Sequence, residues 1–208
     1  MHVDITGDPG SDNTYNQTEI QSVGNYNPAA TTAITNYNFG YVGYDSKRMG
    51  TYFQKLMEEI RRNVAEETID ELRYYCTRLD GTKDMEEKLT DGNFPTSEIQ
   101  DALRLKELYA KRAARFEYYP SAQQITLMLF SRIKHEFNTY IFPLIEAETS
   151  HTVVMQEIRS RIVKPIMQVL DDNDVHEYQL NYHDDHIYGM IYYLTGMCHL
   201  NWKNYDNI

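Results

Sequence analysis

The chain has 208 residues, which is enough for one sizeable domain that buries a core without disulfides or metal ions. Its formal net charge of −11 and its isoelectric point near 5.0 argue against binding of DNA or RNA through a broad basic face, because the molecule as a whole repels phosphate backbones. With two cysteines, no signal peptide and no apolar run of spanning length, the sequence predicts a cytoplasmic protein that does not enter a membrane.

The first 46 residues differ in composition from the rest of the chain. They contain no Lys or Arg and are rich in Asn, Thr, Tyr and Gly, so they cannot bury enough apolar surface to fold alone. A tyrosine nevertheless recurs every eleven residues, at Tyr15, Tyr26 and Tyr37, with β-forming residues between them. This segment is therefore either a disordered polar linker or a set of short strands that pair between copies of the chain or on a partner.

From about residue 46 onwards the apolar residues follow helical spacing. Glycines, prolines and capping residues divide this part of the chain into separate segments. Two pairs, Ser97 with Gln100 and Ser121 with Gln124, have the spacing of capping boxes and predict two helix starts. The predicted helices cover residues 52–64, 69–79, 84–89, 97–116, 121–137, 150–166 and 184–194.

Three positions predict local features of these helices. Pro143 is expected to kink or break the helix that reaches it, and Pro165 to bend the following one. Gly189 lies inside the last predicted helix, where it costs about 1 kcal/mol relative to Ala, so we expect another helix to cross closely there. The sequence thus predicts a mainly α fold: a multi-helix array or bundle over residues 47–208, preceded by the segment 1–46.

Four groups of zinc-ligand type fall within the last part of the chain: His183, His186, Cys198 and His199. Their spacing does not fit a structural zinc site, because the neighbouring Cys198 and His199 would point in different directions on a regular helix. A polar helix start explains the first two histidines better, and a small buried side chain explains Cys198. We therefore expect no metal and no other cofactor, and keep a metal-dependent hydrolase that uses these four residues as an alternative.

A second candidate for catalysis is a metal-nuclease arrangement in which Asp80 or Asp84 acts with Glu86 and Lys88. In such a site the carboxylates hold Mg²⁺ while the lysine supports the attacking water. These residues fall on a short amphipathic helix, and a solvated helix face explains them better.

A basic cluster interleaved with aromatic residues could bind a phosphate group or an acidic partner surface. Glu107 and Lys111 have the spacing and order of a favourable ion pair on a helix, so a salt-bridged exposed face is the simpler explanation. The basic residues are Arg104, Lys106, Lys111, Arg112 and Arg115.

Several short stretches resemble the C-terminal domain of ABC-three-component systems, the Lamassu-type bacterial antiphage systems. The most specific is the terminal pattern Tyr-Leu-Thr-Gly-x-Cys-His-x-x-Trp, which begins at Tyr193 and ends at Trp202. The stretches are Ile69–Tyr75, Met85–Leu89, Ala102–Glu107, Ser121–Ile125, Phe142–Ile145 and Gly189–Trp202.

The resemblance implies a helical module that joins an effector subunit to an SMC-like or Rad50-like ABC ATPase. It transfers no catalytic residue to this chain, and the short polar segment 1–46 offers no nuclease fold. We therefore expect a non-enzymatic interaction, assembly or sensor subunit that docks on the ATPase or on an effector and that forms homo-oligomers through residues 1–46. A helical regulator unrelated to defence is a further alternative.

Trp202, the single tryptophan, has two alternative roles: a core residue or an interface anchor. Direct binding of nucleic acid is not expected. The residues that we expect to contact partners are Tyr15, Tyr26, Tyr37, Tyr193, His199 and Trp202.

Overall fold

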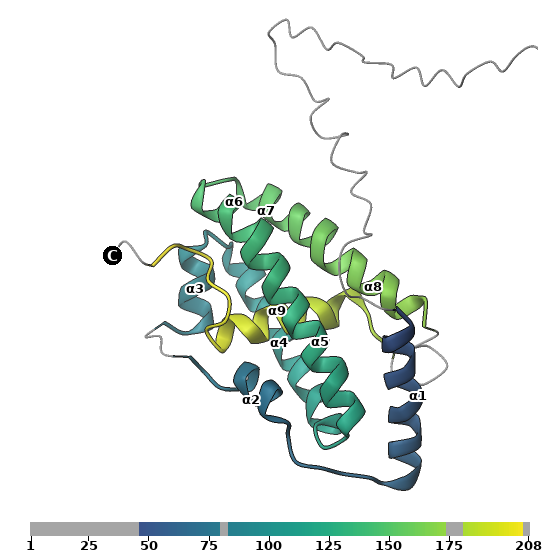
Figure 1. Cartoon of the computed structure of the whole chain (residues 1–208). Helices are drawn as coiled ribbons and strands as arrows, with labels where there is room; N and C mark the ends of the chain where they lie inside the picture. Colours follow the sequence, from purple (N-terminus) through teal and green to yellow (C-terminus); the bar gives the residue numbers. More distant parts are fainter. Residues whose placement is uncertain (1–45, 80–82, 174–180, 206–208) are drawn as a thin grey trace, which may run out of the picture. The chain divides into compact units, whose positions relative to one another are not determined.

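The computed structural model describes residues 46–79, 83–173 and 181–205. All regular structure in these ranges is helical and they contain no strand, which confirms the predicted mainly α fold (Figure 1). None of these helices is long and apolar enough to cross a membrane. The elements are α1 (Ser46–Arg62), α2 (Asp70–Cys76), α3 (Met85–Asp91), α4 (Thr96–Phe116), α5 (Pro120–Glu136), η3 (Phe137–Ile141), α6 (Phe142–Glu146), α7 (His151–Ile158), η4 (Arg159–Val163), α8 (Lys164–Asp171) and α9 (Asp184–Gly196).

The last helix, α9, occupies the middle of the helical array. It crosses α4 and α5 in Figure 1 and also contacts α3 and α8, while α1 and α2 both pack on α5. Its apolar residues are buried with those of the surrounding helices, and each such side chain contributes roughly 1.5–3 kcal/mol. Fully buried core residues include Phe53, Leu89, Ile125, Leu129, Ile133, Phe137, Ile158, Ile187, Met190 and Leu194.

The crossing of α4 and α9 depends on Gly189. A Cβ atom at this position would lie 2.8 Å from Tyr109 Cβ, and it would also overlap the backbone carbonyl oxygen of Leu105. Because a backbone atom cannot rotate away, no residue larger than glycine fits without separating the two helices. The close crossing predicted from the glycine is confirmed.

Neither Pro143 nor Pro165 ends its helix. Each follows a five-residue π-helical turn, η3 or η4, so that the chain continues from α5 into α6 and from α7 into α8. In these turns the amide of Phe142 donates to the carbonyl of Phe137, and the amide of Lys164 donates to that of Arg159. The wider turn relieves the clash between a proline ring and the preceding turn, so of the two outcomes predicted at Pro143, a kink or a break, the break is wrong.

Four helices end in the same backbone motif, with a non-glycine residue in the left-handed conformation after the last turn. At the end of α9, Cys198 has φ 64°, the amide of His199 donates to the Leu194 carbonyl (2.9 Å), and the amide of Cys198 donates to the Thr195 carbonyl (3.1 Å). These two bonds define a Schellman cap. In the described ranges, the residues in this conformation are Asn63, Asn93, Glu148 and Cys198.

The start of α5 is capped from another helix and not by the predicted box. Glu59 of α1 accepts hydrogen bonds from the amide of Ser121 (3.0 Å) and from its hydroxyl (2.6 Å). A carboxylate at this place also interacts favourably with the positive end of the helix dipole. The capping box predicted for Ser97 and Gln100 is also wrong, because α4 begins at Thr96 with no side-chain cap.

Candidate functional site

The four candidate metal ligands lie at opposite ends of α9. His183 and His186 are at its start, and Cys198 and His199 follow its end, so the thirteen-residue helix holds the two pairs about 20 Å apart. No group of three or more His, Cys, Asp or Glu side chains that could hold a metal ion occurs within the described ranges. The structure therefore does not bring these four residues together as a metal centre.

At the start of α9 the two histidines form a helix cap. The backbone amide of His183 donates to Nδ1 of His186 (3.1 Å), and the two imidazole rings stack with their centroids 5.5 Å apart. Desolvation, followed by the positive charge of Arg112, lowers the pKa of His186 to about 4. His186 is therefore neutral at pH 7, which keeps Nδ1 available as an acceptor.

At the other end of α9, His199 is buried beneath two tyrosines of α2. Its ring lies 4.9 Å from that of Tyr74 and 5.4 Å from that of Tyr75. Both ring nitrogens lack a hydrogen-bond partner among the residues that the structure describes. Desolvation and the nearby Lys134 lower the pKa of His199, while backbone groups of α2 oppose this shift.

Trp202 is a core residue of the isolated chain. Only 2% of it is exposed, and its indole packs edge-on against Phe94 (4.7 Å between centroids) and Phe137 (5.1 Å). Its Nε1 donates to the Thr195 hydroxyl (3.0 Å), which in turn donates to the Ile191 carbonyl (3.0 Å). Of the two roles considered for Trp202, this burial favours the structural one.

Two residues of the candidate nuclease site, Asp84 and Lys88, stabilise helix ends. Asp84 and Glu87 form a reciprocal capping box at the start of α3. The side chain of Lys88 is buried, and its Nζ donates to the Thr195 carbonyl near the end of α9 (3.4 Å). Glu86 is exposed, and Asp80 lies outside the described residues. A buried Lys88 that serves another helix does not support a metal-bound water.

Three residues of the basic cluster of α4, Arg104, Lys111 and Arg112, form ion pairs or ring contacts. Lys111 pairs with Glu107 (2.7 Å), and Arg104 pairs with Asp101 (3.0 Å). The guanidinium of Arg112 lies over the Tyr182 ring, 4.1 Å from its centroid. These contacts fit the salt-bridged exposed face that the sequence favoured over a phosphate site.

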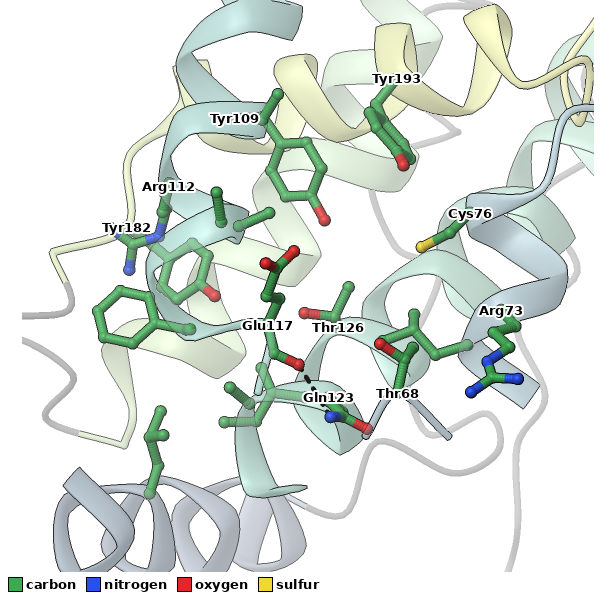
Figure 2. Close-up of a pocket in the computed structure, with 18 residues that line it drawn as sticks. Thr68, Arg73, Cys76, Tyr109, Arg112, Glu117, Gln123, Thr126, Tyr182 and Tyr193 are labelled. Carbon is green, nitrogen blue, oxygen red and sulfur yellow. Dashed lines mark hydrogen bonds between the residues drawn. The ribbon is translucent and has the colours of Figure 1, made fainter. Parts of the chain in front are cut away.

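A pocket of about 360 Å³ lies between α2, α4, α5 and α9 (Figure 2). Its deep side is apolar, formed by Leu56, Leu72 and Ile125. The polar side chains around it come from every one of the four helices and from the segments that join them. They are Thr68, Arg73, Cys76, Arg112, Glu117, Gln123, Thr126, Tyr109, Tyr182 and Tyr193.

Three polar groups meet at the centre of this pocket. Figure 2 shows the hydroxyls of Tyr109 and Tyr193 and the thiol of Cys76 directed into the same space. Desolvation raises the pKa of each, and the negative charge of Glu117 adds to this effect at Tyr193 and Cys76. Neutral hydrogen-bonding groups therefore line the space, and Glu117 supplies a negative potential.

Gln123 fixes the wall of the pocket where two segments meet. Its Oε1 accepts from the amide of Ile69 (2.9 Å), and its Nε2 donates to the carbonyls of Glu117 (2.8 Å) and Glu67 (3.1 Å). One buried amide thus joins the chain before α2 to the end of α4. Because the hydrogen bonds of its side chain are made with backbone groups, Gln123 holds the pocket wall in place and is not the group that would bind a ligand.

A second and more open hollow, of about 610 Å³, lies beside Trp202 between α3 and the α6–α7 connection. Two of its side chains, Asp91 and Glu146, accept hydrogen bonds from Tyr205 (2.9 Å) and Asn204 (2.7 Å). These contacts hold the segment after Trp202 across the hollow.

A family model for C-terminal domain 9 of the ABC-three component (ABC-3C) systems matches residues 84–202. The chain belongs to this family. The match begins one residue before α3 and ends on the buried Trp202. No curated protein and no solved structure matches the chain.

The ABC-3C domain supplies only part of the pocket. Tyr109, Glu117 and Tyr193 lie within residues 84–202, whereas Leu56 of α1 and Cys76 of α2 precede the matched range. The pocket is therefore completed by residues outside the part of the chain that defines the family.

The sequence indicated two residues of this pocket as candidate site residues: Tyr193, which we expected to contact a partner, and Arg112, which belongs to the basic cluster. The other two expected partner residues of the described part, His199 and Trp202, are buried, and Tyr15, Tyr26 and Tyr37 lie outside the described residues. The pocket residues come from segments far apart in the chain, so no spacing in the sequence could have grouped them.

Proposed function

We propose that this chain is a non-enzymatic assembly or sensor subunit of a bacterial antiphage defence complex. The observation that supports this function is the family match over residues 84–202, which implies other components of an ABC-3C system as partners. In the proposed complex the chain acts in the cytoplasm and docks on an SMC-like or Rad50-like ABC ATPase or on an effector subunit. A Lamassu-type system is the specific context that we propose.

The engagement of the candidate catalytic groups supports a role without catalysis. The two histidines at the start of α9 cap that helix, Lys88 bonds to its end, and His199 lies beneath two tyrosine rings. The histidine pair and Lys88 thus have positions explained by the backbone groups that they bind at the two ends of the helix. The family match also favours a defence function over a helical regulator unrelated to defence.

Co-expression with the neighbouring genes tests the proposal. We expect one of them to encode an ABC ATPase, and we expect the full chain to elute with that protein in size-exclusion chromatography. A matched experiment in which the ATPase carries a substitution that prevents nucleotide binding would report whether docking depends on its state. If no neighbouring product forms a complex with the chain, the proposed function is wrong.

A separate experiment tests self-association through residues 1–46. Replacing Tyr15, Tyr26 and Tyr37 together by Ser in the full chain should reduce the oligomer mass measured by light scattering. Replacing the same three residues by Phe keeps the aromatic rings and should leave that mass unchanged. If both variants kept the oligomer mass of the wild type, these tyrosines would be excluded as the contact between copies.

A further inference from the structure

The pocket of Figure 2 combines an apolar interior with an acidic group at its edge. Leu72 and Ile125 are buried at its deep side, whereas Glu117 is exposed where α4 ends. The carboxylate of Glu117 extends from the edge towards the side of the pocket that holds the Tyr109 hydroxyl (Figure 2). A ligand that fits both regions must have an apolar body and one polar or charged end.

The charge of Glu117 determines which kind of polar end fits. No ion pair among the described residues involves Glu117, although its carboxylate interacts with the hydroxyl of the exposed Tyr118. Of the two arginines that line the pocket, Arg73 pairs with Glu67 (3.6 Å) and Asp70 (3.8 Å), and Arg112 lies over Tyr182. Arg112 keeps its positive charge in this ring contact, but Glu117 is the charged side chain that raises the pKa of both Tyr193 and Cys76, so on their side of the pocket its negative charge favours a cation.

The aromatic wall of the pocket is held in place before any ligand binds. The rings of Tyr109 and Tyr193 meet edge to face with centroids 5.3 Å apart, and both pack on Phe130 at 5.7 Å. Because these side chains are already ordered, binding of a ligand costs less side-chain entropy than it would at a mobile wall.

We propose that this pocket binds a small amphipathic organic amine, with its apolar body between Leu72, Ile125 and the Tyr109–Tyr193 wall and its ammonium group at the Glu117 carboxylate. The inference is based on the geometry of the pocket and does not require the proposed role in a defence complex. It gives the sensor role a chemical class of ligand.

Calorimetric titration of the full chain with 2-phenylethylamine tests this proposal, and 2-phenylethanol serves as the uncharged probe of nearly the same shape. We expect the amine to bind at least about tenfold more tightly than the alcohol at pH 7, because only the amine has an ammonium group for Glu117. Equal binding of the two probes, or no binding of the amine at millimolar concentration, would overturn the proposal.

Two variants locate the binding. Glu117→Gln keeps the shape of an exposed side chain but removes its charge, and it should weaken amine binding about tenfold while leaving the weak binding of the alcohol unchanged. Glu107→Gln, which removes an exposed carboxylate from the same helix outside the pocket, should bind the amine as the wild type does. Identical affinities of both variants for the amine would refute the site.

A third probe distinguishes a free amine from the lysine side chain of a protein partner. Nα-acetyl-lysine methylamide has the same kind of charged end but carries a peptide backbone at its other end. Weaker binding of this probe than of 2-phenylethylamine supports a free small molecule, and tighter binding would overturn that assignment. Failure of the amine to bind would not change the expected co-elution with the ATPase. The two proposals can therefore be refuted independently.

Discussion

The two ends of α9 contain similar residues but use them in different ways. At the start, the buried His186 accepts a hydrogen bond from the backbone amide of the exposed His183. Beyond the end, His199 and Trp202 are buried among aromatic rings, and the polar contacts of this region involve Thr195 and Lys88. The amides and carbonyls at both ends of a helix need hydrogen-bond partners. The comparison shows that histidines and a cysteine close in sequence can lie at opposite ends of one helix and need not form a common metal or catalytic site.

The largest expected effect concerns the aromatic cluster that follows α9. Trp202→Ala should lower the free energy of unfolding by about 3 to 5 kcal/mol, because it leaves a cavity between Phe94 and Phe137 and removes the bond to Thr195. Urea unfolding followed by circular dichroism measures the change, and Trp202→Phe should retain more of the stability. If the Trp202→Ala variant instead had the unfolding free energy of the wild type but no longer bound the partner protein, Trp202 would be an interface anchor. The structural role assigned here to the region after α9 would then be wrong.

Between the two ends, Gly189→Ala tests the crossing that holds α9 in place. The added methyl group meets the backbone of α4, so we expect a loss of about 2 to 3 kcal/mol in the free energy of unfolding, despite the better helix propensity of Ala. Gly196→Ala is a matched control at the end of α9, since its methyl group would meet only the flexible end of Lys106. We expect this control to lie within about 0.5 kcal/mol of the wild type, and equal losses would contradict our account of the crossing.

The start of α9 should show the greater dependence on pH. The pKa of His186 is about 4 in the folded chain and about 6.5 when unfolded, so the unfolded chain binds the proton first as pH falls. The stability due to neutral His186 is therefore present above about pH 6.5 and is lost towards pH 4. Urea unfolding at pH 7 and pH 5 should differ by about 2 kcal/mol because of this group.

The variant His186→Asn isolates this contribution. Its amide oxygen can accept the bond from the His183 amide but does not titrate. The difference in unfolding free energy between pH 7 and pH 5 should therefore be smaller in the variant than in the wild type by about 2 kcal/mol. An unchanged pH dependence would show that His186 is not the titrating group.

The smallest expected effect is at the Schellman cap that follows α9. Cys198 is held in the left-handed conformation that suits glycine, so Cys198→Gly should raise the free energy of unfolding by up to about 1 kcal/mol. Glu148→Gly, at an exposed cap of the same kind, should act in the same direction without loss of buried packing. Thermal unfolding of both variants measures the effect, and a loss of stability at Glu148 would contradict it.

The helical fold and the crossing at Gly189 could be predicted because periodicity and a glycine within a helix report directly on local geometry. The start of α5 could not, because Glu59, the residue that caps it, is distant in sequence. Pro143 was expected to kink or break its helix, but a π-helical turn needs only one extra residue per turn, and nothing in the sequence distinguishes that solution from a break.

The pocket could not be predicted from the sequence for a related reason. Tyr109 and Cys76 belong to helices whose spacing predicts burial or exposure but not which helices become neighbours. The position of Gln123 within a buried helix start gave no indication that its amide bonds to four backbone groups of other segments.

The central position of α9 also affects the order in which the molecule can fold during synthesis. Because α4 precedes α9 by the whole of α5 to α8, translation at roughly 5–20 residues per second leaves α4 without its partner for several seconds. During this interval the surface around Leu105 and Tyr109 that later covers Gly189 is open to solvent and to other chains. The nascent chain is therefore vulnerable to aggregation or to chaperone binding until α9 leaves the ribosome.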